Sequence, residues 1–143
     1  MKTNNILILV VLLFLSFSIK SQTLTIEITN IKNKKGKIAV AIFTNNKNFK
    51  KETPYIEKFY NKNNVCNGTL NIKLKLKPGI YGVSILDDEN NDGKMKYNIL
   101  GVPKEGFGFS DYYHTGIIKP KFNNFSFKIQ NNNKKVIVKM KYM

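Results

Sequence analysis

The chain has 143 residues, of which 24 are basic and nine are acidic, giving a formal net charge of +15. Every basic residue is lysine. Arginine is the residue that makes bidentate hydrogen bonds to phosphate groups and to the edge of guanine, so its absence disfavours a nucleic-acid partner. Cys66 is the only cysteine, which excludes an intramolecular disulfide.

The N-terminus has the anatomy of a secretory signal peptide. Lys2 precedes an apolar run, Ile6 to Phe17, and a mainly polar segment follows at 18–22. The run has about a dozen residues, fewer than the roughly 20 that cross a bilayer as a helix, so we expect cleavage rather than a membrane anchor. Residues 1–21 are therefore predicted to be a signal peptide. Residues 22–143 are predicted to form a single exported domain, periplasmic or extracellular, without a transmembrane segment.

The rest of the chain consists of short runs in which apolar and polar residues alternate. A period of two places successive side chains on opposite faces of a sheet, which predicts strands. A turn at 33–36 predicts that the first two runs form a hairpin, and the second run is apolar on both faces. No run has a sustained helical period. The runs cover residues 24–28, 38–42, 70–76, 81–85, 125–129 and 136–142, with a further candidate at 55–60.

This pattern predicts an all-β protein: an antiparallel β-sandwich of the immunoglobulin-like or transthyretin-like kind, with about seven strands. Lys73 and Lys75 alternate with apolar residues, which is typical of a solvated sheet face. Two segments, 45–54 and 98–124, do not follow the strand pattern. Long irregular segments of a secreted β domain often carry its function.

An acidic loop follows one predicted strand and alternates oxygen-bearing residues before a glycine. Asp88, Asn90 and Asp92 would supply side-chain oxygens to a calcium ion, Lys94 a backbone carbonyl, and Gly93 the bend. No carboxylate stands at the later ligand positions of a helix-flanked calcium loop, so the expected dissociation constant is weak, about 0.1–1 mM. The alternative is a β-hairpin turn that tolerates positive φ and binds no metal.

A second loop combines glycines with aromatic residues. Glycines at 101, 106 and 108 permit backbone geometry that other residues disfavour, and aromatic side chains offer flat surfaces to a sugar or a peptide. The alternative is that these rings cover one open end of the sandwich. The predicted ligand-contact residues are Glu105, Phe107, Phe109, Tyr112, Tyr113 and His114.

Four sequence blocks stand out along the chain, at residues 36–43, 76–81, 88–94 and 100–110. They read GKIAVAIF, LKPGIY, DENNDGK and LGVPKEGFGFS. In this order they resemble the secreted bacterial family called domain of unknown function 2141, which implies a compact extracytoplasmic β-sandwich with no established reaction. Where that family usually has His before the acidic loop, this chain has Asp87. Where it often has Asp three residues after the loop glycine, this chain has Lys96.

Together these features predict a non-catalytic binding or accessory module of the bacterial envelope, with a glycan or a protein as ligand. The chain contains no Gly-x-Ser-x-Gly elbow, no His-Glu-x-x-His helix and no phosphate loop. The alternative is a small extracytoplasmic hydrolase in which Asp88 or Glu105 supplies a carboxylate. A third interpretation, a polycation bound to anionic envelope polymers, predicts binding that weakens steeply as salt rises.

Overall fold

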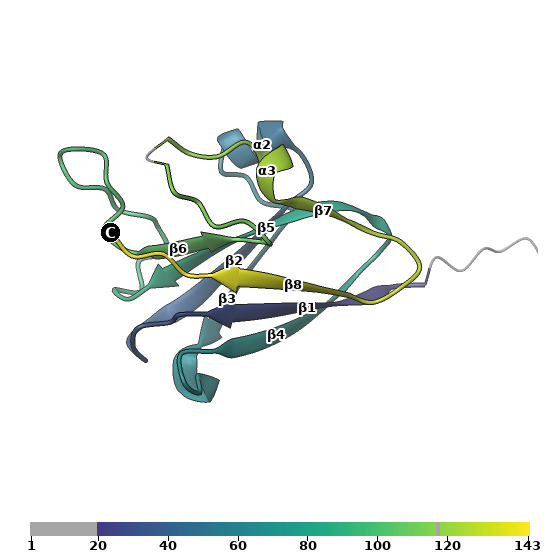
Figure 1. Ribbon diagram of the computed structural model, residues 1–143, viewed down its shortest axis with the longest axis horizontal. Helices are drawn as coiled ribbons and strands as arrows, with labels where there is room; N and C mark the ends of the chain where they lie inside the picture. Colours follow the sequence, from purple (N-terminus) through teal and green to yellow (C-terminus); the bar gives the residue numbers. More distant parts are fainter. Residues whose placement is uncertain (1–19, 117) are drawn as a thin grey trace, which may run out of the picture.

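The protein is built from two β-sheets packed face to face, as the alternating pattern predicts (Figure 1). The computed structural model describes residues 20–116 and 118–143, so residues 1–19 of the predicted signal peptide lie outside the described residues. One sheet has the strand order β4-β1-β8, and the other has the order β3-β2-β5-β6, with β7 also paired to β5. The elements are β1 (Gln22–Thr29), β2 (Lys37–Phe43), α2 (Asn46–Lys50), β3 (Ile56–Asn61), η1 (Lys62–Asn64), β4 (Leu70–Leu76), β5 (Gly79–Asp88), β6 (Gly106–Phe109), α3 (Phe122–Phe125), β7 (Ser126–Ile129) and β8 (Lys134–Lys139).

Side chains from the inner faces of the two sheets form the main core. β1 and β4 alternate strictly between buried and more exposed positions, and Lys73 and Lys75 are exposed as predicted. Burial of each branched aliphatic side chain contributes roughly 1.5–3 kcal/mol, so this layer holds the two sheets together. The core residues without exposed surface include Leu24, Ile26, Ile28, Ile38, Val40, Ile42, Val83, Val136 and Val138.

The predicted hairpin between the first two strands is wrong. β1 pairs with β4 and β8, whereas β2 pairs with β3 and β5 in the other sheet. β1 has one apolar face and one polar face, while β2 is mostly buried on both faces because its sheet is covered on both sides. The turn at 33–36 therefore carries the chain from one sheet to the other, and Gly36 adopts φ +70° against the backbone of Asp88.

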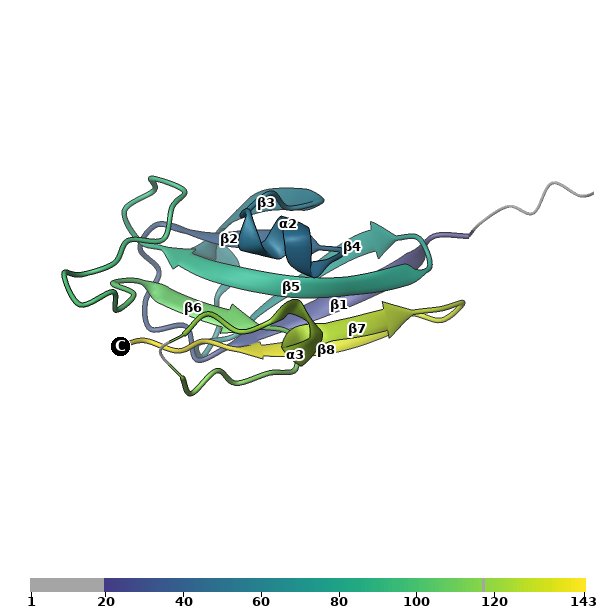
Figure 2. The same cartoon turned by 90° about the horizontal axis from the view of Figure 1, so that it is seen from above.

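Eight strands are present in the described part of the chain, where about seven were predicted. The addition is β6, which lies inside a segment predicted to be irregular. All strand pairs are antiparallel except β1 and β8, which run parallel, so the prediction of a fully antiparallel sandwich is wrong for this pair. β8 arrives from β7 in the opposite sheet, and no tight hairpin constrains its direction. β5 is long enough to pair with both β6 and β7 along its length (Figure 2).

Two short helices cover the outer face of the five-stranded sheet (Figure 1). α2 begins after Asn45, whose side chain accepts a hydrogen bond from the Asn48 backbone N–H at 2.9 Å, and α2 contacts α3. α2 lies in a segment predicted to be irregular, and so does α3 except for Phe125, which was predicted to begin a strand but ends this helix instead. No helix of the described residues is long and apolar enough to span a membrane. Beneath the two helices lies an aromatic cluster, separate from the main core: Phe43, Phe49, Phe107, Phe109, Phe122 and Phe125.

Candidate functional site

Strand β6 alternates glycine with phenylalanine, and this alternation builds one side of the site. Its glycines face the three-stranded sheet, where a Cβ added at Gly108 would lie 2.6 Å from Val138. Phe107 and Phe109 point the other way, into the aromatic cluster. The glycine face of β6 therefore packs closely against β8. The phenylalanine face forms part of the wall of a cavity on the other side of the sheet.

A cavity of about 210 Å³ opens on the outer face of the five-stranded sheet. Small side chains of the central strands, Ala39, Ala41 and Ser84, form its floor and leave space that larger residues would fill. At its edge the Glu52 carboxylate and the Lys119 ammonium form an ion pair of 2.7 Å. The remaining walls are mostly apolar and include Phe43, Phe49, Met95, Tyr97, Phe107 and Phe109.

The structure brings three of the six predicted ligand-contact residues together at this cavity. Phe107, Phe109 and His114 line it, and the two phenylalanines are only 7% and 6% exposed. Tyr113 is instead 48% exposed, with the Lys139 ammonium 5.3 Å from the centre of its ring. The rings of β6 thus cover the outer face of a sheet rather than an open end of the sandwich. The residues outside the cavity lining are Glu105, Tyr112 and Tyr113.

His114 is a buried polar group in the cavity wall. Its ring centre lies 6.1 Å from that of Phe109 and 5.9 Å from that of Tyr112. Neither ring nitrogen has a hydrogen-bond partner among the residues described. Burial lowers the pKa of His114, and the positive charge of Lys141 lowers it further. The nearby Ile118 backbone raises the pKa slightly, although it makes no hydrogen bond of ordinary geometry to the ring. These surroundings favour the neutral imidazole, which has one donor and one acceptor nitrogen.

The acidic loop folds around its own first carboxylate. Asp88 ends β5 and is 1% exposed, and its two oxygens accept hydrogen bonds from the backbone N–H groups of Asp92 (3.1 Å) and Gly93 (2.9 Å). The Asn90 side-chain oxygen also accepts from Asp92 N–H at 2.9 Å. Asp92 in turn accepts from Lys94 N–H at 3.0 Å. Every residue of the predicted calcium set therefore takes part in hydrogen bonds that shape the loop.

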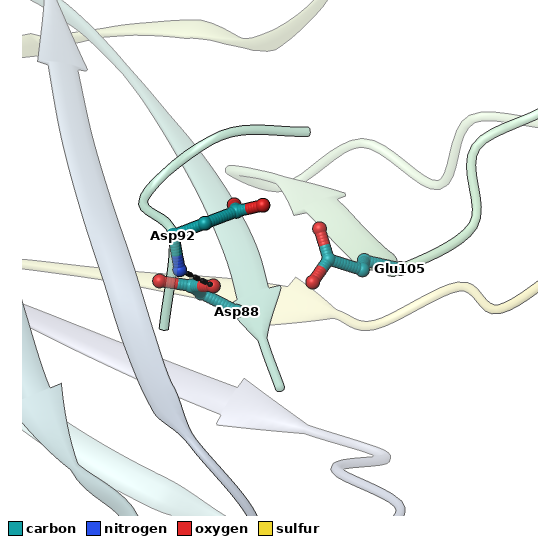
Figure 3. A group of neighbouring side chains, drawn as sticks. All are labelled: Asp88, Asp92 and Glu105. Carbon is teal, nitrogen blue, oxygen red and sulfur yellow. Dashed lines mark hydrogen bonds between the residues drawn. The ribbon is translucent and has the colours of Figure 1, made fainter. Parts of the chain in front are cut away.

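Glu105 joins Asp88 and Asp92 in a group of three carboxylates (Figure 3). One oxygen of each carboxylate lies within 4.8 Å of the others. Strand register explains this meeting. Asp87 pairs with Gly106, so Asp88, the last residue of β5, lies at the same end of this strand pair as Glu105, which directly precedes β6. The sequence prediction assigned Glu105 to the ligand-contact loop and missed its partnership with the acidic loop. The alternation of glycine and phenylalanine at 106–109 is a period-two pattern, and it could have indicated strand β6.

The electrostatics of Glu105 follow from its surroundings. Burial raises the pKa of Glu105, and the negative charges of Asp88 and Asp92 raise it further. The backbone and the ammonium of Lys96 oppose this shift, although no hydrogen bond of ordinary geometry reaches the carboxylate. Such a group of carboxylates can bind a cation or share a proton.

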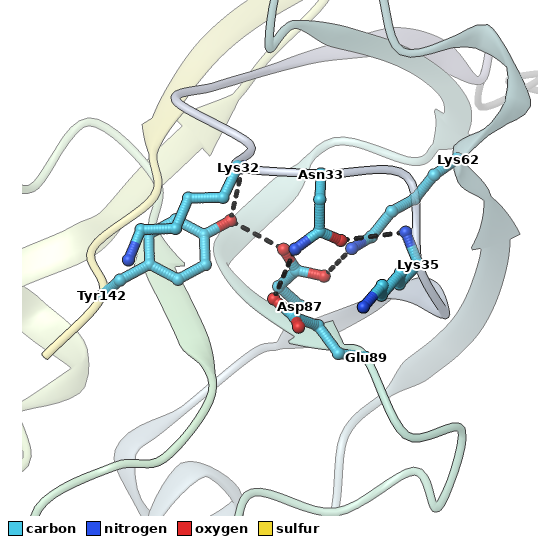
Figure 4. A network of polar contacts seen from close by, with 7 residues as sticks. All are labelled: Lys32, Asn33, Lys35, Lys62, Asp87, Glu89 and Tyr142. Carbon is cyan, nitrogen blue, oxygen red and sulfur yellow. Dashed lines mark hydrogen bonds and ion pairs between the residues drawn. The ribbon is translucent and has the colours of Figure 1, made fainter.

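Asp87, which precedes Asp88 in β5, forms a buried ion pair with Lys62 (Figure 4). Neither side chain has exposed surface. Tyr142 donates its hydroxyl to the second oxygen of Asp87 at 2.6 Å, and burial together with this bond raises the pKa of Tyr142. The network joins η1, the end of β5 and the C-terminus beside the acidic loop. Lys62 was not predicted to be buried, because no local pattern distinguishes it from the other 23 lysines.

A family model described as an uncharacterised protein conserved in bacteria, domain of unknown function 2141 (DUF2141), matches residues 26–137. The chain belongs to this family. The resemblance drawn from the four sequence blocks is thereby confirmed. The DUF2141 match includes β2, β5, β6 and the whole acidic loop, but the family description names no activity. No curated protein and no solved structure matches the chain.

Proposed function

We propose that this DUF2141 protein is an exported, non-catalytic module that binds a protein of the bacterial envelope by receiving one apolar side chain in the cavity. The cavity itself carries the proposal, because it combines apolar walls, a charged edge and an imidazole with free nitrogens. Export is supported by the signal-peptide anatomy of residues 1–21. An immunoglobulin-like or transthyretin-like sandwich is the fold type that we propose for the two stacked sheets.

The size of the cavity favours a single side chain over a larger ligand. Sites for drug-sized molecules have volumes of roughly 300–1,000 Å³, whereas this cavity has about 210 Å³. An oligosaccharide would also need open aromatic faces. The ring of Phe109 meets those of Phe49 and Phe107 at steep angles, 84° and 63°, so these rings pack against one another. A protein ligand therefore fits the site better than a glycan does.

The chemistry of the walls indicates an aromatic or branched apolar side chain. Aromatic rings in the wall can pack edge-to-face with an incoming ring, and neutral His114 can hydrogen-bond a nearby polar group. At the edge, Glu52 and Lys119 are exposed and can pair with the backbone of a bound segment. Insertion of one anchor side chain, surrounded by polar contacts at the rim, is a common way for proteins to associate.

A hydrolase that uses Asp88 or Glu105 has less support. Glycoside hydrolysis requires two carboxyl groups that flank a substrate bond. Both of these side chains are buried, and neither lines the cavity. Asp88 also accepts two backbone hydrogen bonds that hold it within the loop. These placements favour a binding function.

Nuclear magnetic resonance with capped single amino acids tests the proposal. On addition of N-acetyl-phenylalanine amide, we expect chemical-shift changes at Ala41, Phe109 and His114, and none along β4 on the far side of the sandwich. N-acetyl-glycine amide, which has no side chain to insert, is the control. Equal responses to the two amides, or shifts confined to residues away from the cavity, would overturn the proposal.

A further inference from the structure

Glu105 is a buried carboxylate without a partner. Its residue is 9% exposed, and neither side-chain oxygen makes a hydrogen bond within residues 20–116 and 118–143. A buried charge is strongly unfavourable unless it is paired or coordinates a metal. Glu105 therefore requires a cation or a proton close to its carboxylate.

The Glu105 carboxylate points toward those of Asp88 and Asp92 (Figure 3). The three oxygens lie within 4.8 Å of one another. Oxygens bound to one calcium ion lie 2.3–2.6 Å from it, so two such oxygens are at most about 5 Å apart. The observed spacing therefore accommodates one calcium ion among the three carboxylates.

Asp88 remains able to coordinate an ion while it holds the loop. Each of its oxygens accepts one backbone hydrogen bond, from Asp92 or from Gly93. A carboxylate oxygen has capacity for a second interaction, so both oxygens can still face a cation. The same hydrogen bonds fix the orientation of the carboxylate before an ion arrives.

We propose that Asp88, Asp92 and Glu105 together bind one calcium ion. The three side chains come from the two ends of the loop between β5 and β6, so the ion would join these ends. Calcium suits the site because it accepts carboxylate oxygens in flexible geometry. Compared with the ligands predicted from sequence spacing, the essential addition is Glu105, which enters from the far end of the loop.

Lys96 limits the affinity of this site. Its ammonium pairs with Asp92 at 2.5 Å, and it is largely exposed. Three carboxylates and one ammonium leave a local charge of about −2, which attracts a divalent cation. The Lys96 ammonium competes with the cation for the Asp92 carboxylate. We expect a dissociation constant of about 0.1–1 mM, the range of extracellular calcium modules.

The ion would also steady one wall of the cavity. Met95, Tyr97 and Pro103 line the cavity and belong to the loop between Asp92 and Glu105. Closing the loop around calcium would restrict their movement. This consequence for ligand binding depends on the proposed function, whereas the calcium site itself does not.

Calcium binding can be measured without any other ligand. The purified protein is first treated with chelator, and its melting temperature is then recorded with about 10 mM calcium chloride or with sodium chloride of equal ionic strength. We expect calcium to raise the melting temperature by at least about 5 °C. Isothermal titration calorimetry should show one site per chain. A melting temperature identical in the two salts, together with no heat of binding, would overturn the proposal.

Two variants and a control locate the site. Glu105→Gln should lose the calcium response and melt at a higher temperature than wild type in chelator, because it removes a buried, unpaired charge. Glu57→Gln makes the same chemical change at an exposed position and should keep the wild-type response. Lys96→Gln should tighten calcium binding roughly threefold, because it removes the competing ammonium. A wild-type response in Glu105→Gln, or weaker binding by Lys96→Gln, would contradict the assignment.

Discussion

Breaking the buried ion pair of Lys62 and Asp87 should destabilise the protein strongly. Both side chains lack exposed surface, and the Tyr142 hydroxyl is a further partner of Asp87. Asp87→Leu would leave a buried ammonium without its counter-ion, and Lys62→Met would leave a buried carboxylate with one hydroxyl. An unpaired buried charge of this kind costs about 3–5 kcal/mol. That is a large part of the 5–15 kcal/mol by which a typical domain is stable.

Urea unfolding followed by circular dichroism measures these losses. We expect each single variant to lower the free energy of unfolding by about 3–5 kcal/mol. The double variant replaces both charges with apolar groups and should lie within about 1 kcal/mol of wild type. Lys135→Met is the control, because the side chains of Lys135 and Glu27 are 57% and 26% exposed and their ion pair should contribute less than about 1 kcal/mol. Losses below about 1 kcal/mol in the single variants, or a loss in the double variant equal to the sum of the single losses, would show that the two charges do not stabilise each other.

Two further predictions concern a turn and the pH dependence of stability. Gly36→Ala should lower the free energy of unfolding by about 1–3 kcal/mol, because Gly36 has φ +70° and an added Cβ would clash with the Asp88 backbone. A urea midpoint equal to that of wild type would contradict this expectation. Because burial lowers the pKa of His114, the unfolded chain binds a proton there more tightly than the folded one does. This contribution to stability is present above pH 6.5 and is lost as the pH falls below it. His114→Phe should remove that loss, and equal acid sensitivity of variant and wild type would disprove it.

Period-two alternation predicts the strands well because burial of one sheet face imposes it directly on the sequence. β1 and β4 follow the expected pattern, and the candidate run at 55–60 is β3. Alternation does not say which strands pair, and the turn at 33–36 looked like a hairpin although it connects two sheets. The two apolar faces of β2 were the sign that β2 belongs to a sheet covered on both sides.

The candidate site was predicted in part. Its aromatic residues and the acidic loop were identified because their composition is unusual for a surface connection. Their arrangement depends on strand register, which places Asp88 beside Glu105 across a long loop and cannot be read from either segment alone. Lys62 meets Asp87 from a distant short helix, and this contact has no local sequence signal. The floor of the cavity was missed as well, because alanines in a strand do not by themselves indicate a cavity.

Measuring the affinity of wild type and of Ala41→Leu for N-acetyl-phenylalanine amide shows whether the cavity receives an apolar side chain. Ala41 lies in the cavity floor, so a larger side chain there would occupy the space of the ligand. At roughly −0.3 kcal/mol per non-hydrogen atom, a ligand of about 15 such atoms should bind with a dissociation constant on the order of 1 mM. We expect this affinity for wild type and at least about tenfold weaker binding by a folded Ala41→Leu protein. Equal affinities for the two proteins would contradict it.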